Sequence, residues 1–140
     1  MSEPAAQPNA PHVAGHTAGH VAPVTLYDTL SATKKPLALL EPGRCKLYVC
    51  GPTVYDMSHI GHARAAVVPD ILVRTLRAAG VEVLYVRNIT DVEDKIIKAA
   101  NAEGIDPLAL AVRYADAYNA DMTRFGMLPP DVEPDRKSVV

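Results

Sequence analysis

Apolar residues recur along the chain at two spacings, one typical of strands and one typical of helices, and the order of these segments predicts the fold. Residues 46–50 follow a Pro-Gly turn and are predicted to form a strand. Residues 81–87 are apolar on both alternate sets of positions, which is typical of a parallel strand covered on both faces. Between them, apolar residues at helical spacing predict a helix over residues 63–79, which Gly80 would end.

Two further helices are predicted downstream. Residues 90–93 (Thr-Asp-Val-Glu) match a capping box, which predicts that Thr90 begins a helix ending at Gly104. Asp106 as N-cap and Pro107 at the first helical position predict a third helix. Its predicted buried stripe, closed by Gly126, consists of Ala111, Ala115, Tyr118, Met122 and Phe125.

The order strand, helix, strand, helix, helix predicts an α/β fold, the opening half of a doubly wound parallel sheet with crossover helices. Pro69 interrupts the first helical stripe and predicts either a kink or two short helices. The folded part is expected to begin near Val24. Residues 1–23 are rich in Ala, Pro and His without periodicity, which predicts a disordered low-complexity tail. Glycines and prolines in that tail disfavour a helix that would align its three histidines for a metal: His12, His16 and His20.

Composition narrows the class of protein. The chain has 140 residues, enough for about one domain, and its net charge of −2 gives no basic footprint for nucleic acid. Cys45 and Cys50 are five apart on one predicted strand, so their side chains point to opposite faces and a disulfide between them is disfavoured. This cysteine usage predicts a cytoplasmic protein. No apolar run is long enough for a membrane span, and no signal peptide is recognisable.

The segment His59-Ile60-Gly61-His62 lies where a loop is predicted to enter the first helix. Free backbone N–H groups and the helix dipole favour phosphate at such a position, and imidazole N–H donors add to that preference. Gly61 has no Cβ, so a flat ring such as adenine can approach the backbone. The alternative interpretation is a pair of histidines that cap the helix or form an incidental metal pair.

Cys50 and Thr90 each follow a predicted strand, so both are expected at the edge of the sheet where α/β folds bind ligands. Cys50 is interpreted as either a small buried hydrophobic residue, a nucleophile or a metal ligand. Thr90 is also a good N-cap for the next helix, and the two roles are compatible. The remaining basic residues of the first helix are predicted to form a solvated face: Arg64, Arg74 and Arg77.

His59-Ile60-Gly61-His62 is similar to the HIGH tetrapeptide of class I aminoacyl-tRNA synthetases. The flanking segments 48–56 and 85–97 resemble cysteinyl-tRNA synthetase in particular, and the similarity runs from about Leu26 to Pro134. The resemblance implies that residues 24–134 form the N-terminal part of a Rossmann-like synthetase catalytic domain. It also implies a cytoplasmic, monomeric enzyme that uses ATP with Mg²⁺ to activate L-cysteine and transfers the cysteinyl group to tRNA(Cys).

The same resemblance implies roles for seven residues. His59, Gly61 and His62 would bind ATP, and the two histidines would be catalytic. Cys50 would be one ligand of a zinc ion that binds the substrate thiolate. Because zinc prefers thiolate to hydroxyl, it would select cysteine over serine. The cysteine pocket would be lined by Cys50, Gly51, Thr53 and Thr90.

The chain lacks several features that the resemblance would imply for the whole family. The other zinc ligands, the KMSKS loop and the tRNA-binding regions lie far downstream in the family, so the truncated chain is expected to be inactive alone. Residues 135–140 match the translation of a widely used sequencing adapter, which predicts a non-native tail; the alternative is a natural divergent end. Two other functions stay open: the cysteine–amino-sugar ligase of mycothiol synthesis, and a non-catalytic half-domain that binds a nucleotide.

Overall fold

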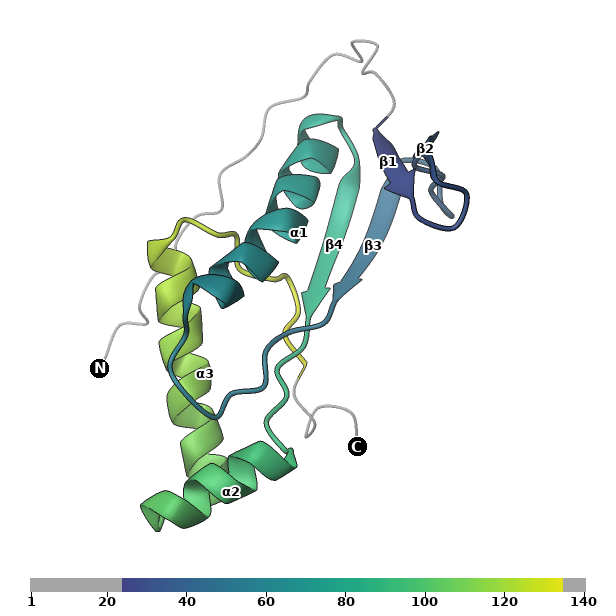
Figure 1. The fold of residues 1–140 in the computed structure, drawn as a ribbon. Helices are drawn as coiled ribbons and strands as arrows, with labels where there is room; N and C mark the ends of the chain where they lie inside the picture. The colour runs from purple at the N-terminus through teal and green to yellow at the C-terminus, as the bar shows by residue number, and fades with distance from the viewer. Residues whose placement is uncertain (1–23, 135–140) are drawn as a thin grey trace, which may run out of the picture.

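The computed structural model describes residues 24–134, so the predicted tail over 1–23, its histidines and the predicted non-native segment 135–140 lie outside the described residues. Four strands and three helices make up that part of the chain (Figure 1). In chain order they are β1 (Thr25–Asp28), β2 (Thr33–Pro36), β3 (Arg44–Val49), α1 (Ile60–Ala78), β4 (Glu82–Arg87), α2 (Asp94–Glu103) and α3 (Pro107–Arg124).

A parallel strand-helix-strand unit forms the centre of the structure, as predicted. β3 pairs with β4 in parallel, from Arg44 opposite Glu82 to Val49 opposite Arg87, and α1 joins the two strands. α1 packs against one face of this pair, where apolar side chains of both strands and the helix form a core. The most deeply buried of them are Val73, Leu76, Val83 and Tyr85.

The opposite face of β4 is open, so the prediction that both faces are covered is wrong for the described residues. Leu84 is 42% exposed on that face, and Tyr48 of β3 is 64% exposed. α2 and α3 do not cover it, because they pack together and α2 lies beyond the carboxyl ends of the strands (Figure 1). The apolar pattern on both sides of β4 therefore has a covering layer on one side only.

α1 is a single helix of 19 residues that continues through Pro69, so the alternative of two short helices is wrong. It begins at Ile60, three residues earlier than predicted, because His59 serves as its N-cap. Gly80 follows the C-cap with a φ of +77°, a conformation that favours glycine, and this confirms the predicted end.

α2 begins at Asp94 and not near Thr90, so the predicted capping box is wrong. Its N-cap is Glu93, whose side chain makes no capping hydrogen bond. The backbone of Thr90 is instead engaged with the chain after β3: its N–H donates to the carbonyl of Pro52 at 3.0 Å. Gly104 ends the helix in the left-handed conformation, as predicted.

α3 has the predicted start and end. The Asp106 carboxylate accepts a hydrogen bond from the Ala109 N–H at 3.0 Å, Pro107 is the first helical residue, and Gly126 has a φ of +77°. The predicted apolar stripe is buried or half-buried through Met122 but not at its last position, since Phe125 is 58% exposed.

The chain after α3 returns along β4. Val132 forms a parallel bridge with Val86, the Arg87 N–H donates to the Val132 carbonyl at 3.2 Å, and the Asp131 N–H donates to the Tyr85 carbonyl at 2.8 Å. The segment 131–134 therefore occupies the edge of β4 that β3 leaves free. Three elements of the parallel layer are thus present in the described residues.

Two of the three arginines predicted to form a solvated face bind this returning segment. Arg74 Nη2 donates to the Gly126 carbonyl at 2.7 Å, and Arg77 Nη2 lies 2.9 Å from the Asp131 carboxylate. Only Arg64 matches the prediction in being exposed without such a contact. The prediction failed because the partners lie more than 50 positions away in sequence.

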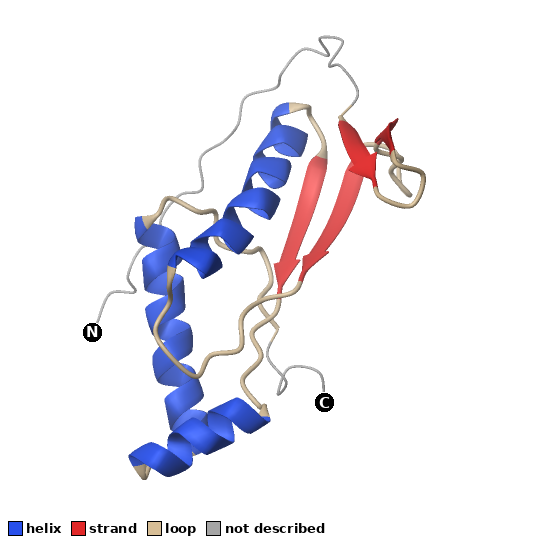
Figure 2. Cartoon of the chain, in the orientation of Figure 1, coloured by secondary structure: helices blue, strands red, loops and turns tan. Residues whose placement is uncertain are grey.

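An antiparallel hairpin of β1 and β2, which the sequence pattern did not predict, precedes the parallel unit (Figure 2). Its turn contains Ala32 with a φ of +52°, a conformation that glycine or asparagine usually supplies. The Asp28 carboxylate stabilises the turn by accepting hydrogen bonds from Ser31 and Lys35. Without a glycine or asparagine signal, the hairpin is invisible to local sequence rules.

Candidate active site

The chain segments that leave β3 and β4 stay side by side beyond the strands. Thr53 and Thr90 form a parallel bridge, and the Val54 N–H donates to the Thr90 carbonyl at 3.3 Å. The Gly51 N–H donates to Asn88 Oδ1 at 2.9 Å. Three of the four residues predicted to line a cysteine pocket therefore lie at the carboxyl edge of the sheet. Thr53 and Thr90 are joined by backbone pairing, and Gly51 is held by the Asn88 side chain.

Gly51 is where the two segments come closest. A Cβ at this position would lie 1.6 Å from the Asn88 carbonyl oxygen and 2.8 Å from its carbon, far inside van der Waals contact. Only a residue without a side chain fits there. The glycine is therefore needed for the close approach that forms this edge, independently of any ligand.

Cys50, the fourth predicted pocket residue, directly follows β3 and is exposed. This excludes the interpretation of Cys50 as a buried hydrophobic residue, whereas Cys45 is half-buried against the core. The Cys50 Sγ lies 3.7 Å from the Gly51 carbonyl oxygen, a weak contact. The thiol is thus free and accessible at the same edge as the two threonines.

His59 and His62 lie together in the first turn of α1. Their ring centroids are 4.1 Å apart with an interplanar angle of 44°. His59 Nδ1 accepts a hydrogen bond from the Gly61 N–H at 3.0 Å, and His62 Nδ1 accepts one from the His59 N–H at 3.1 Å. The pair thus forms a reciprocal capping box built from two imidazoles.

These bonds fix the tautomer of both rings. A nitrogen that accepts a hydrogen bond carries no proton, so each neutral ring carries its proton on Nε2. Burial, and secondarily the charge of His59, lower the pKa of His62, which favours its neutral form. The capping role and a donor role are therefore compatible, because capping uses Nδ1 and leaves each Nε2–H free.

A steric constraint also explains why a glycine is needed at position 61. A Cβ there would lie 2.7 Å from His59 Cε1 and 2.9 Å from His59 Nδ1. Any larger residue would displace the His59 ring from its hydrogen bond with the helix terminus. Within residues 24–134, no hydrogen bond or ring contact joins the histidine pair to the Cys50, Thr53 and Thr90 edge. The structure therefore presents two separate groups of predicted site residues.

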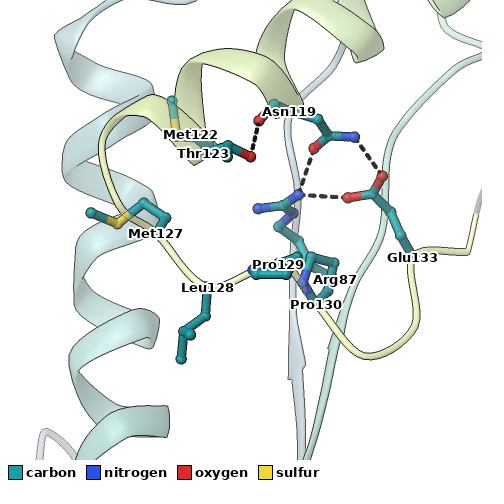
Figure 3. Close-up of a pocket in the computed structure, with 9 residues that line it drawn as sticks. All are labelled: Arg87, Asn119, Met122, Thr123, Met127, Leu128, Pro129, Pro130 and Glu133. Atoms are coloured by element: carbon teal, nitrogen blue, oxygen red, sulfur yellow. Dashed lines mark hydrogen bonds and ion pairs between the residues drawn. The ribbon is translucent and has the colours of Figure 1, made fainter. Parts of the chain in front are cut away.

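A buried ion pair that the sequence analysis missed lies beside Tyr118 of α3. Arg87 is 4% exposed, and its Nη2 donates to Glu133 at 2.5 Å and to Asn119 at 2.8 Å (Figure 3). Asn119 also donates to the other Glu133 oxygen at 2.8 Å. A charged residue inside an apolar strand was the available signal, but nothing local identifies its partners.

This triad forms one wall of a cavity of about 260 Å³. The rest of the lining is largely apolar (Figure 3): Met122, Met127, Leu128, Pro129 and Pro130. The lining contains none of the seven predicted site residues. This cavity is therefore distinct from both groups of predicted site residues.

Comparison with known proteins decides the family. Residues 36–140 match the family model described as tRNA synthetases class I (C) catalytic domain, which covers most of the chain. The chain belongs to this family. The synthetase resemblance drawn from His59 to His62 and from the flanking segments is thereby confirmed.

Curated relatives agree with this synthetase assignment. The chain is 61% identical over 111 residues to a cysteine–tRNA ligase of Anaeromyxobacter sp. (strain K), covering 79% of the chain and 23% of the relative. It is 55% identical over 109 residues to that of Syntrophobacter fumaroxidans (78% and 22%) and 51% identical over 111 residues to that of Brevibacillus brevis (79% and 24%). The chain spans about a quarter of the length of these relatives.

Residues 24–134 do not form a metal centre by themselves. Within residues 24–134, no three His, Cys, Asp or Glu side chains gather closely enough to hold a metal ion. Cys50 can supply one thiolate, and zinc in proteins generally has at least three protein ligands. None of the helices in the described range is long and apolar enough to cross a membrane.

Proposed function

We propose that this chain is the first part of the catalytic domain of a cysteine–tRNA ligase. The complete enzyme would join L-cysteine to ATP, releasing pyrophosphate, and would then transfer the cysteinyl group to tRNA(Cys) in the cytoplasm. Family membership and relatives at 51–61% identity support this proposal over the amino-sugar ligase alternative. ATP, with Mg²⁺ as its counterion, is the substrate to which we assign His59, Gly61 and His62 of the described range.

The observation that carries the proposal is the pair of Nε2–H donors at the N-terminus of α1. In adenylate formation a carboxylate oxygen of cysteine attacks the α-phosphorus, the bond to pyrophosphate breaks, and charge increases on the oxygens in between. Imidazole donors beside the free N–H groups of a helix N-terminus stabilise such charge. We assign this role to His59 and His62, and close contact with the nucleotide to Gly61.

The sheet edge is proposed as the cysteine site. Cys50, Gly51, Thr53 and Thr90 meet there, with the Cys50 thiol exposed and the two threonines paired. When zinc is bound in the complete enzyme, it would supply the preference for thiolate over hydroxyl, with Cys50 as the ligand from this chain. The other ligands would come from beyond the described residues, so no step of the reaction is assigned to the metal here.

The test for the ATP site exchanges the imidazoles for an ordinary capping box. The double variant His59→Asn/His62→Gln places a good N-cap residue and a Gln three positions later, which keeps the helix start but removes the outward imidazoles. Isothermal titration with Mg²⁺–ATP is expected to show at least about tenfold weaker binding, because hydrogen bonds to charged groups contribute ~1.5–3 kcal/mol each.

Arg64→Ala is the matched control, since it removes an exposed positive charge from the same helix. It is expected to leave ATP affinity within about twofold. Equal binding by the wild-type chain and the double variant, or no ATP binding by the wild-type chain, would overturn the assignment of the histidine pair.

Activity itself separates an enzyme fragment from a binding module. We expect the 140-residue chain to show no appreciable ATP–pyrophosphate exchange dependent on L-cysteine, because Cys50 is the single zinc ligand assigned to it. Robust exchange would contradict this expectation. ATP binding without exchange, together with exchange by a full-length relative, is the expected combination.

A further inference from the structure

We propose that Tyr118 of α3 is a positioning residue for His62, holding its ring so that Nδ1 faces the helix backbone and Nε2–H faces the nucleotide. This inference rests on the proposed function for the direction of Nε2–H. The position of the ring itself is a property of the fold. A line of contacts runs from His62 at the start of α1 through Tyr118 and Arg87 to Glu133 of the returning segment.

The first contact joins Tyr118 to His62. Their ring centroids lie 6.2 Å apart at an interplanar angle of 79°, an edge-to-face arrangement that aromatic rings prefer. His62 is half-buried and Tyr118 is 6% exposed, within a cluster that includes Ala63 and Ala66 of α1. Tyr118 thus packs against small side chains of α1, and its ring contacts His62 in the first turn of that helix.

The second contact fixes Tyr118 from another side. The Arg87 Cζ lies 5.0 Å from the centroid of the Tyr118 ring, a cation–π distance. Arg87 in turn is held by Glu133 and by Asn119, the residue next to Tyr118 (Figure 3). The guanidinium is buried, and its Nη2 is hydrogen-bonded to two partners. Its plane is therefore held in place where it packs against the Tyr118 ring.

These contacts leave His62 few alternatives. A ring flip about χ2 would exchange the carbon and nitrogen positions and would cost the hydrogen bond from the His59 N–H, 3.1 Å long in this structure. Tyr118 restricts the space for other orientations, while burial and the nearby His59 charge, which lower the pKa of His62, keep the ring neutral. To donate from Nε2–H to a phosphate oxygen, His62 must hold one tautomer in one orientation.

The test reads the tautomer directly. Side-chain ¹⁵N NMR of the 140-residue chain, with His62 assigned by loss of its signals in His62→Gln, is expected to show an unprotonated Nδ1 and a protonated Nε2 above pH 7. In Tyr118→Leu the two nitrogens are expected to move toward averaged shifts. Mg²⁺–ATP binding is expected to weaken about 2- to 10-fold, matching ~0.5–1.5 kcal/mol for an aromatic pair.

Two variants separate positioning from general destabilisation. Tyr118→Phe keeps the ring and is expected to restore the wild-type tautomer signals. Met122→Leu changes a buried residue of the same cluster, one turn away on α3, and is expected to leave the His62 signals unchanged. If Tyr118→Leu does not give a folded spectrum, Tyr118→Met, with an unbranched apolar side chain, takes its place.

Wild-type tautomer signals in a folded Tyr118→Leu or Tyr118→Met chain would overturn the inference, as would an equal change in Met122→Leu. Failure of the proposed function gives a different result. In that case ATP would cause no shift at His59 or His62 in the wild-type chain, while the tautomer comparison between variants would still be decided.

Discussion

At Gly51 the chain after β3 lies so close to the chain after β4 that there is no room for a side chain. These two segments carry the residues of the proposed cysteine pocket. Any Cβ there would collide with the Asn88 carbonyl, so Gly51 is fixed by packing before any ligand is considered. The resemblance assigned Gly51 to substrate binding. The structure shows that a steric requirement alone explains why a glycine is needed at this position.

Gly51→Ala is therefore expected to destabilise the chain by about 1–3 kcal/mol or more, since the added methyl group must push two backbone segments apart. The measurement is the free energy of unfolding in urea. Gly126→Ala serves as the control: its φ is +77° but nothing lies within 4 Å of an added Cβ, so only backbone strain of roughly 1 kcal/mol applies. Similar losses in both variants would contradict the steric explanation.

The lowered pKa of His62 gives a pH dependence of defined sign. Burial first, and the His59 charge second, lower it below the ordinary value of 6.5. The unfolded chain then binds a proton more readily than the folded chain does. The stability contributed by neutral His62 is therefore complete above about pH 6.5 and declines as the pH falls toward the lower, folded-state pKa.

Urea midpoints measured at pH 7.5 and pH 5.5 check this expectation. The wild-type midpoint is expected to be lower at pH 5.5, and His62→Gln, which cannot titrate but can cap the helix, is expected to show a smaller difference. An identical pH dependence in the wild-type and variant chains would exclude His62 as its source.

Side-chain roles were predictable where the partner is local. The position of the histidine pair at a helix start followed from residues 59–62 alone, whereas the sequence left open whether Cys50 is buried, and the structure shows it exposed. Arg87 was not predictable in the same way. Its partners Asn119 and Glu133 are 32 and 46 positions away, and only the folded chain brings them together.

The ends of helices show the same distinction at the level of elements. Asp106, Gly80, Gly104 and Gly126 lie where predicted, because each acts through its own backbone or its nearest neighbours. Thr90 carries an equally good local signal and does not cap α2. Its backbone pairs with the chain after β3, a non-local interaction that continues the sheet and outweighs the capping preference.

Asp70 connects α1 to the segment that follows α3. It is 6% exposed, accepts the Leu128 N–H at 2.8 Å through one oxygen, and binds Arg74 Nε at 2.7 Å through the other. Burial alone would raise its pKa, but the bonds from Arg74 and the Leu128 amide outweigh that effect and lower it. The carboxylate is thus a charged link between two elements.

Asp70→Ala is expected to cost about 2–4 kcal/mol of stability, because it leaves a backbone N–H and a guanidinium without their acceptor. Chemical denaturation measures the loss. Arg64→Ala, an exposed change on the same helix, is expected to stay within about 0.5 kcal/mol. A loss for Asp70→Ala that is as small as the control would show that the link contributes little.

For the molecule as a whole, the open face of the sheet is the dominant feature. Tyr48 and Leu84 are exposed on neighbouring parallel strands, where a doubly wound fold would place a covering layer. The prediction that this face is covered is wrong for the described residues, and the face is mixed: Tyr48, Leu84 and Val86 lie beside the charged residues Arg44, Lys46 and Glu82. The exposed apolar side chains of this face, Tyr48 and Leu84, favour association between molecules.

We therefore expect the isolated chain to self-associate at micromolar concentration and the double variant Tyr48→Thr/Leu84→Thr to do so less. Threonine keeps the strand preference while removing apolar area. Sedimentation velocity over a concentration series measures this. Leu30→Thr/Leu40→Thr changes two leucines that are 97% and 103% exposed outside the parallel sheet, and it is expected to behave as the wild-type chain. A monomeric wild-type chain would refute the expectation.

The returning segment has a consequence for the order in which the chain can fold during synthesis. Asp131 binds Arg77 and the Tyr85 N–H, and Glu133 binds Arg87, across sequence separations of 46 to 54 residues. These contacts cannot form until residue 133 has been added by the ribosome. A nascent chain that ends before it lacks the carboxylate partner of Arg87, and contacts over such separations form slowly. The strand-helix-strand unit can therefore gain its third neighbour in the parallel layer only after the last described residues have been synthesised.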